Sequence, residues 1–412
     1  IQNKLKLNKG QALILSCSES ICWLANIRGQ DVPHSPLMNC YALVYQNHVC
    51  IYSMKDSYRD NVIKLRNNVT LKHFTVLFKD IKKLKKVFFE PTSTPFILKS
   101  KITGQHIKLE KVCNPITLLK AKKNPIELKG SIKSHEKDGL ALLRFIKWFK
   151  STKIDDLHEI TLVKKFEEIR KFEPSFYYNS FDTISATGSN AAITHYRVSA
   201  KSNKKIKTSE LVLVDSGGQY LEGTTDVTRT LIKGRALKKQ KFLYTKVLQG
   251  LICLSKLRWP AGLTGKELDP LARHFLWEHG LDYDHGTGHG VGVFSNVHQG
   301  PQGITRINTV PLEPGMILSI EPGIYLEGKL GIRLENLVYV KRKSTHSEQK
   351  KEFLEFETLT LAPFEKNLIE KKLLSREELI WLNSYHRNID RKLRPFLSDT
   401  EKTWLRETCK AL

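Results

Sequence analysis

The pattern of apolar and polar positions changes near residue 120. Before it, short apolar runs alternate with polar breaks, which is typical of strands, and we expect strands at 11–16, 40–53 and 71–78. Further along, apolar positions recur at helical spacing over longer stretches. They predict four helices, at 131–150, 155–172, 236–257 and 264–280.

Strand-like segments follow both pairs of helices. Apolar, β-branched runs predict strands at 210–218, 225–232 and 316–340. The last helix carries its own boundary signals, because Thr264 and Glu267 stand at capping-box spacing and Gly280 closes it. This order of elements predicts an α+β domain whose strands are largely antiparallel.

The length of the chain predicts two domains, because a single core seldom serves more than about 250–300 residues and this chain has 412. The stretch 113–130 holds two prolines and many lysines, which is typical of a linker. We therefore expect a first domain over 1–120, a linker over 121–130 and a second domain over 131–412.

The composition narrows the class of protein. A hydrophobic share of 40% and a charged share of 26% are typical of a globular protein. No apolar run is long enough to span a membrane, and no signal peptide is recognisable before Cys17. The 7 cysteines form no C-x-x-C pair, which argues against a disulfide framework or a cysteine zinc site. We expect a cytoplasmic protein.

The net charge of +25 raises the question of nucleic-acid binding. Most of this charge is lysine spread along the chain, without the arginine forks and interleaved aromatic residues of specific nucleic-acid readers. A solvated lysine-rich surface explains it, with non-specific adhesion to polyanions at low salt. We expect no specific nucleic acid and no membrane as partner.

Two histidines stand in a glycine-rich stretch, HGTGHGVG, at 285–292. It is not a dinucleotide fingerprint, because residue 291 is Val where the last glycine should fall, and it lacks the G-K-[ST] ending of a phosphate loop. Its glycines also disfavour the continuous helix of the helical zinc motif. Two loop histidines alone are more often structural, so their context has to decide.

That context is four acids at strand positions. Asp215 ends the run LVLVD, and Asp226 follows in TTDVTRT after two glycines, which predicts a hairpin with a tight Gly-Gly turn that aims both carboxylates at one point. Glu321 and Glu335 also have apolar neighbours. Each acid alone could be structural, but buried acids are costly unless they are paired or bind a cation.

The four carboxylates carry four negative charges, which two divalent cations would neutralise. Oxygen donors with one imidazole favour Mn²⁺, Co²⁺ or Fe²⁺, and Zn²⁺ also fits. Two ions ~3.5 Å apart can share a hydroxide that is nucleophilic near neutral pH. The glycines would let the backbone approach such a site and leave a path for substrate.

The chain resembles the pita-bread metallopeptidases, which include methionine aminopeptidase, prolidase and aminopeptidase P. The resemblance rests on DSGGQYLEGTTDVTRT, HGTGHGVG, SIEPGIY and GIRLEN, and it implies five metal ligands: Asp215, Asp226, His289, Glu321 and Glu335. It is closest to the cytosolic Xaa-Pro aminopeptidases, through GLDYDHGTGHGVGVFSNVHQGPQGI, the tail FEFETLTLAPFEKNLI and WLANIRGQDVPHSP at 23–36. It covers nearly the whole chain and implies a C-terminal pita-bread (creatinase/aminopeptidase) domain preceded by a smaller creatinase-N-like α/β domain.

The resemblance implies roles for further residues. His195 is similar to a histidine that lines the substrate cleft, His285 to one on the proline side, and His298 to one that contacts the scissile-bond region. Arg333 is similar to an arginine that holds the acidic ligands. Without the family, each histidine could be an ordinary loop residue and Arg333 a surface ion pair. We expect Glu321 also to move a proton to the leaving nitrogen.

The implied reaction is hydrolysis of an N-terminal Xaa-Pro bond by a hydroxide that bridges two metal ions, most simply Mn²⁺, between Asp226 and Glu335. The implied partners are peptides with proline at the second position and a second copy of the chain. Enzymes of this branch usually have three domains, and the chain resembles the second and third. Two alternatives stay open: a prolidase restricted to dipeptides, and a non-catalytic binding protein on the same scaffold.

Overall fold

A computed structural model of the chain describes residues 5–54, 65, 67–103, 106–343 and 351–412. The chain folds as two compact units, Ile1–Lys120 and Ala121–Leu412, which are described separately below. In these described ranges, no helix combines the length and the apolar character that crossing a lipid bilayer requires.

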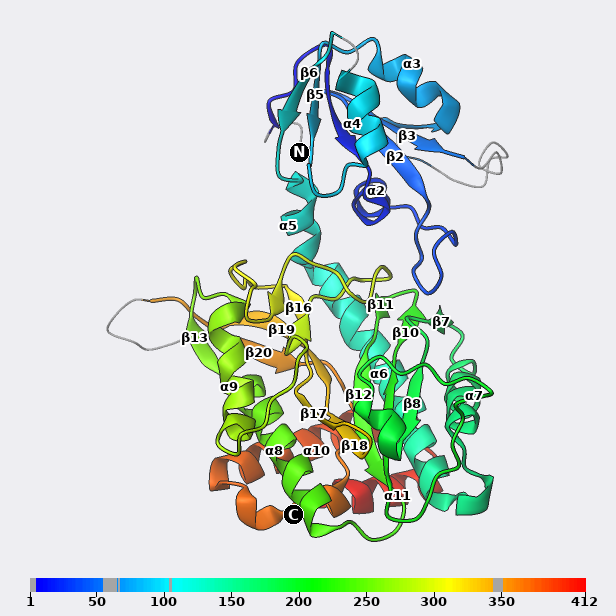
Figure 1. Ribbon diagram of the computed structural model, residues 1–412, viewed down its shortest axis with the longest axis vertical. Coiled ribbons are helices and arrows are strands. Elements are labelled where there is room, and N and C mark those ends of the chain that lie inside the picture. Colours follow the sequence, from blue (N-terminus) through cyan, green and yellow to red (C-terminus); the bar gives the residue numbers. More distant parts are fainter. Residues whose placement is uncertain (1–4, 55–64, 66, 104–105, 344–350) are drawn as a thin grey trace. The chain divides into compact units, whose positions relative to one another are not determined.

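The first unit is an α/β layer structure on one mixed sheet, in the order β4-β3-β2-β1-β5-β6 (Figure 1). Side chains of the central strand alternate between two cores: Leu13 and Leu15 face one, Ala12 and Ile14 the other. Helices α2 and α5 cover the first face, and α3 and α4 the second. The elements are β1 (Gln11–Leu15), α2 (Ser18–Ala25), β2 (Cys40–Val44), β3 (Val49–Ser53), β4 (Val69–His73), α3 (Leu77–Ile81), β5 (Lys86–Phe89), α4 (Phe96–Thr103), β6 (Lys108–Lys111) and α5 (Pro115–Ala121).

Two predictions about local structure are wrong. The expected strand 71–78 ends at His73, whose ring accepts a hydrogen bond from the Thr75 amide and caps a 3₁₀ turn that leads into α3. The expected linker 121–130 is largely helix, because α6 begins at Pro125. Asn124 caps this helix, and proline is favoured at a first helical position because its missing N–H would have no partner there.

The second unit is built on several short sheets. All the strand pairings described in it are antiparallel, in agreement with the sequence prediction. Strand β9 runs between β8 and β12, and a second sheet has the order β13-β20-β19-β16. Three small ribbons, β11-β10-β7, β14-β15 and β17-β18, complete it. The strands are β7 (Phe176–Asn179), β8 (Ile184–Thr187), β9 (Leu211–Ser216), β10 (Gly218–Tyr220), β11 (Gly223–Thr224), β12 (Val227–Ile232), β13 (Arg258–Pro260), β14 (Gly288–His289), β15 (Gly303–Ile304), β16 (Ile317–Ile320), β17 (Gly323–Leu326), β18 (Leu330–Arg333), β19 (Asn336–Lys343) and β20 (Phe353–Thr358).

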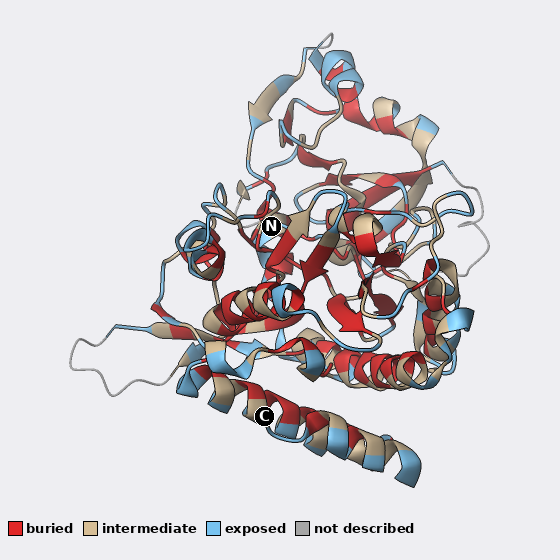
Figure 2. Cartoon of the chain, turned by 60° about the horizontal axis from the view of Figure 1, so that its bottom comes forward, coloured by how far each residue is buried: buried red, intermediate tan, exposed pale blue. Residues whose placement is uncertain are grey.

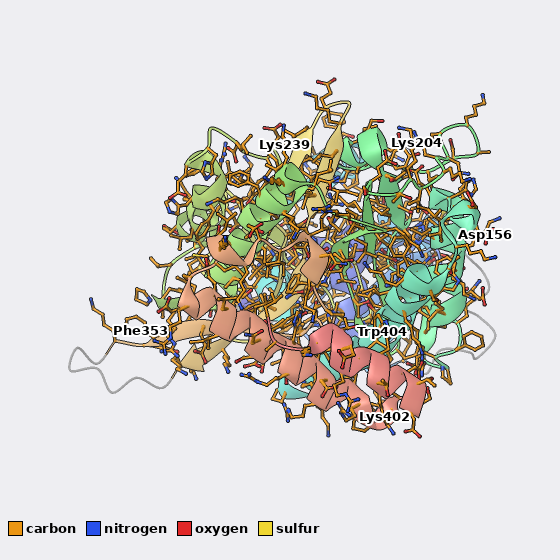
Figure 3. The ribbon with its side chains drawn as sticks, turned by 90° about the horizontal axis from the view of Figure 1, so that it is seen from below. Asp156, Lys204, Lys239, Phe353, Lys402 and Trp404 are labelled. Carbon is orange, nitrogen blue, oxygen red and sulfur yellow. The ribbon has the colours of Figure 1, made fainter. Side chains whose placement is uncertain are left out.

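Helices cover the outer faces of these sheets. Figure 2 shows buried residues on most of the strands, whereas several of the helices expose one face; α8 is buried over most of its length. All four predicted helices are confirmed with small shifts at their ends. Seen from below, two C-terminal helices lie side by side, with the labelled Trp404 packed against the core (Figure 3). The helices are α6 (Pro125–Ser151), α7 (Glu159–Arg170), α8 (Lys238–Ser255), α9 (Gly265–Trp277), α10 (Arg376–Leu393) and α11 (Asp399–Cys409).

Candidate metal centre

Five side chains with metal-binding donors converge inside the second unit. Asp215 lies on β9, and Asp226 stands immediately before β12. His289 ends β14, Glu321 follows β16, and Glu335 stands between β18 and β19. The sheets therefore bring together all five ligands that the resemblance implied, although these residues are widely separated in the sequence.

The two aspartates meet as predicted, but through a different connection. Strands β9 and β12 pair antiparallel, with Asp215 opposite Thr228. The predicted tight Gly-Gly turn is wrong, because the chain continues past Gly217 into β10 and returns through β11 before it reaches Asp226. Gly217 is required for close packing instead: a Cβ there would lie 1.9 Å from the carbonyl oxygen of Thr225.

The donor atoms of these five side chains form two overlapping groups, and a third group joins Asp226 and His289 to His298. Those of Asp215, Asp226 and Glu335 all lie within 4.8 Å of one another, and so do those of His289, Glu321 and Glu335. Because both groups contain Glu335, they describe two neighbouring positions for ions. The His289 Nε2 atom lies 3.5 Å from an oxygen of Asp226 and 3.5 Å from one of Glu321, which leaves room for a cation between them.

The donors fit a cation electrostatically as well. Asp215 Oδ1 and Glu335 Oε1 are buried and have no hydrogen-bond partner among the described residues. Burial, reinforced by Asp215 and Glu321, raises the pKa of Asp226 well above its usual value. Burial and the charges of Asp226 and Glu321 do the same to the pKa of Glu335. Positive charge at this point would remove the cost of these crowded carboxylates.

A second layer of hydrogen bonds orients the ligands. The Nδ1 atom of His289 lies 3.0 Å from the carbonyl oxygen of Gly290, which can only accept, so Nδ1 carries the proton and Nε2 is free to bind a metal. The Ser319 hydroxyl donates to Glu321 at 3.0 Å. The Thr228 hydroxyl donates to Glu335 at 2.9 Å. These contacts hold three of the five ligands in fixed orientations.

Arg333 connects the ligands to His285 through a tyrosine. Its Nη2 donates to Asp215 Oδ2 at 2.6 Å, and its Nη1 donates to the Tyr325 hydroxyl at 2.7 Å. That hydroxyl lies 2.9 Å from His285 Nε2 and donates to it, because the His285 Nδ1 proton is directed to the Gly286 carbonyl oxygen at 2.8 Å. Burial lowers the pKa of His285 and raises that of Tyr325 to about 12, so both are neutral at pH 7.

The five candidate ligands line a cleft with a volume of about 450 Å³. His195, His285 and His298 line it together with Phe181 and Arg333. The His298 ring lies 4.2 Å from that of His289, and burial and His289 lower its pKa to about 4. All the residues that the sequence proposed for the site therefore lie around one cavity.

Sequence reasoning missed the polar residues that support the ligands. Ser319 precedes Glu321, the carboxylate it supports, by two positions, and a search for hydroxyl residues at this spacing would have found it. Thr228 supports Glu335, which is more than one hundred residues away in the sequence, so local spacing gives no signal for it. Tyr325 gives no such signal, because its role depends on the pairing of β17 with β18.

The glycines of HGTGHGVG serve close packing. Added Cβ atoms would lie 2.5 Å from the Thr305 side chain at Gly286, 1.9 Å from the Ser319 carbonyl oxygen at Gly288, and 2.1 Å from the Gln299 carbonyl oxygen at Gly290. These contacts explain the glycines by packing against neighbouring residues. That they also bring backbone close to a bound ion or substrate stays a prediction.

Comparison with known proteins identifies the class. Residues 131–342 match the family model of metallopeptidase family M24, and residues 352–412 match the C-terminal region of that family. Residues 1–127 match the creatinase/prolidase N-terminal domain. The chain belongs to the M24 metallopeptidases, and its creatinase-type N-terminal domain and pita-bread catalytic domain are those that the sequence predicted.

Individual relatives give a narrower comparison. A probable Xaa-Pro aminopeptidase P of Paracoccidioides lutzii is 38% identical over 434 residues, which cover 99% of this chain and 70% of the relative. An X-prolyl aminopeptidase of Caenorhabditis elegans, described as a cytosolic enzyme with a di-nuclear active site, is similar with a TM-score of 0.92 and 34% identity, over 100% of this chain and 69% of that one. A prolidase of Pyrococcus furiosus shares the fold, with a TM-score of 0.70 at 24% identity over 87% of this chain and 98% of its own.

Proposed function

We propose that this protein is a metal-dependent aminopeptidase that releases the N-terminal residue of peptides whose second residue is proline. The observation that carries the proposal is the pair of overlapping ligand groups that line the cleft. The similarity over the whole chain to an X-prolyl aminopeptidase supports the choice of substrate.

The ligand groups define how two ions would be held. Asp215, Asp226 and Glu335 would bind one, and His289, Glu321 and Glu335 the other. The oxygen-rich donors with one imidazole favour Mn²⁺, and they also suit Co²⁺, Fe²⁺ or Zn²⁺. When bound, the two ions would polarise the scissile carbonyl and lower the pKa of a water molecule so that it attacks near neutral pH.

Glu321 would move the proton. Burial acts to raise its pKa, but His289, His285 and Arg333 outweigh burial and leave the pKa lowered, so the carboxylate is ionised and can accept a proton from the attacking water. A proline nitrogen carries no hydrogen in the peptide and leaves as an amine only after it gains one. Glu321, oriented by Ser319, is the group we assign to this transfer.

The cleft histidines would bind the substrate. Because His285 and His298 have lowered pKa values, they are neutral at pH 7 and add no positive charge beside the metal ions. We assign His285 to the proline side of the cleft, where Tyr325 fixes its orientation, and His298 to the scissile bond. His195 lines the same cleft and would also contact the substrate.

The proposal extends to the setting of the enzyme. We propose a cytoplasmic homodimer, with residues 1–120 as the creatinase-type domain and 131–412 as the catalytic domain. Sedimentation velocity tests the dimer directly: a species of twice the 47.3 kDa chain mass supports it, and a monomer at micromolar concentration contradicts it.

A panel of three peptides tests the proposed activity. Purified protein with Mn²⁺ is offered Xaa-Pro-Yaa, Xaa-Pro and Met-Ala-Yaa in equal amounts, and products are identified by mass. We expect release of Xaa from the first peptide. Cleavage of the Xaa-Pro dipeptide alone would select a prolidase, and salt-sensitive RNA binding without any cleavage would select a non-catalytic binding protein.

A further inference from the structure

The loop that carries His285 and His289 is held in place by residues that do not belong to the loop. Gly286, Gly288 and Gly290 alternate with the functional residues, and glycine restricts the backbone less than any other residue. Catalytic side chains nevertheless need a fixed position, because a displacement of about 1 Å can lower a rate about 100-fold. Contacts from another element must therefore supply the rigidity that this backbone lacks.

Helix α9 supplies these contacts through Arg273, a buried residue with 2% exposure. Its Nη2 donates to the carbonyl oxygen of His285 at 2.7 Å, and its Nη1 donates to the carbonyl oxygen of Tyr283 at 2.6 Å. The other three N–H groups bind Asp269, through two bonds of 2.7 and 3.1 Å, and Asp282 at 2.9 Å. All five donors of the guanidinium are thereby satisfied.

Asp269 adds a hydrogen bond on the other side of Gly286, at Thr287. Besides binding Arg273, its Oδ1 accepts a hydrogen bond of 2.6 Å from the Thr287 hydroxyl. The carbonyl oxygen of Thr287 in turn accepts the Glu321 amide at 2.7 Å. One buried ion pair therefore contacts the loop on both sides of Gly286, through the backbone carbonyl of His285 and the side-chain hydroxyl of Thr287.

Helix α9 is anchored by its N-terminal cap and by close packing on α8. A capping box of Thr264 and Glu267 fixes its first turn. It packs so closely on α8 that a Cβ at Gly250 would lie 2.3 Å from the Ala272 carbonyl oxygen. A side cavity of about 250 Å³ lies beside Arg273 and His285.

We propose that Arg273, held by Asp269, is a positioning residue that sets His285 in the cleft. Arg273 does not line the substrate cleft and acts through the backbone of the loop. Lysine cannot replace it, because an ammonium group has three donors and cannot span Asp269 and two carbonyl oxygens in one plane. The proposal rests on the proposed peptidase activity, to which it adds a residue outside the cleft.

A double-mutant cycle tests this coupling with kcat on an Xaa-Pro-Yaa peptide. We expect Arg273→Lys to lower kcat about 10- to 100-fold with KM changed by less than about threefold, and to have almost no further effect in the His285→Ala background. An equal loss in both backgrounds would overturn the proposal. If Arg273→Lys does not fold, Thr287→Val, which removes the hydroxyl and with it the bonds to Asp269 and to the Tyr283 hydroxyl, is measured in the same cycle with the same two outcomes.

The matched control is Arg394→Lys. Arg394, the C-cap of α10, binds Asp390 four residues earlier, as Arg273 binds Asp269 on α9, but this pair is more exposed and lies outside the cleft. We expect this variant to keep wild-type kcat. A loss equal to that of Arg273→Lys would show a general effect of removing a helical ion pair and would contradict the proposal.

Amide hydrogen exchange separates this proposal from the proposed activity, because it needs no turnover. We expect Arg273→Lys to accelerate exchange at the amides of residues 285–290 at least about tenfold over wild type, and Arg394→Lys to leave it unchanged. Unchanged exchange in Arg273→Lys would refute the positioning role, even with an active enzyme. A wild-type protein without peptidase activity would refute the proposed function and leave this measurement valid.

Discussion

Metal loading should raise the melting temperature of the second unit by about 9 °C. Without a cation, Asp215, Asp226 and Glu335 hold their carboxylates within 4.8 Å, where two charges repel by about 3.5 kcal/mol at an effective dielectric constant of about 20. An ion at 100 times its Kd stabilises the folded state by about 2.7 kcal/mol, so two ions contribute about 5.4 kcal/mol. For Ala121–Leu412 an unfolding entropy of about 0.6 kcal/mol/K converts this to the stated shift.

The assay is calorimetry of EDTA-treated protein before and after addition of Mn²⁺. Asp226→Asn should melt at a higher temperature than wild type without metal, because it removes one of the crowded charges, but it should lose most of the Mn²⁺-dependent shift. Asp155→Asn, at an exposed ion pair with Lys205, is the control and should keep the full shift. A shift below about 3 °C with both ions bound, or a full shift in Asp226→Asn, would refute the reasoning.

Three further predictions follow from single side chains. His289→Ala should abolish peptide cleavage, measured by mass, because it removes the imidazole ligand; near-wild-type activity would contradict the site. Arg333→Lys should weaken Mn²⁺ binding about 10-fold in calorimetric titration, because Asp215 loses an orienting partner. His386→Gln should flatten the acid dependence of stability, measured by urea unfolding in EDTA. Burial lowers the pKa of His386 to about 3, so its stabilisation is present above about pH 6.5 and is lost as pH falls, by about 3 kcal/mol at pH 4. An equal acid response in His386→Gln would refute this assignment.

The candidate metal ligands could be picked out from the sequence because each lies in a short local pattern. Asp215 ends an apolar strand and His289 lies between glycines, so burial and chemistry are both visible at the residue itself. Even the meeting of Asp215 with Asp226 follows from two neighbouring strands that pair antiparallel. The predicted Gly-Gly turn between them was wrong. A pair of glycines is compatible both with a tight turn and with close packing of the backbone against a neighbouring strand.

Other features depend on packing that no local pattern reveals. The prolines of 113–130 are compatible with a linker or with a helix start, and only the Asn124 cap decides for the helix. Asp269 and Arg273 have the spacing of a surface ion pair on a helix, and their role appears only when α9 is packed on α8 with the histidine loop beneath it. Supporting residues are therefore harder to predict than the ligands they orient.

The most direct test of the dinuclear peptidase is a titration of the metal-free protein with Mn²⁺. Bound ions per chain are counted by native mass spectrometry, and release of Xaa from an Xaa-Pro-Yaa peptide is measured in the same samples. The account predicts occupancy that saturates at two ions per chain, with cleavage that rises as the sites fill and disappears in EDTA. Cleavage that persists in EDTA, or two bound ions without cleavage, would contradict it.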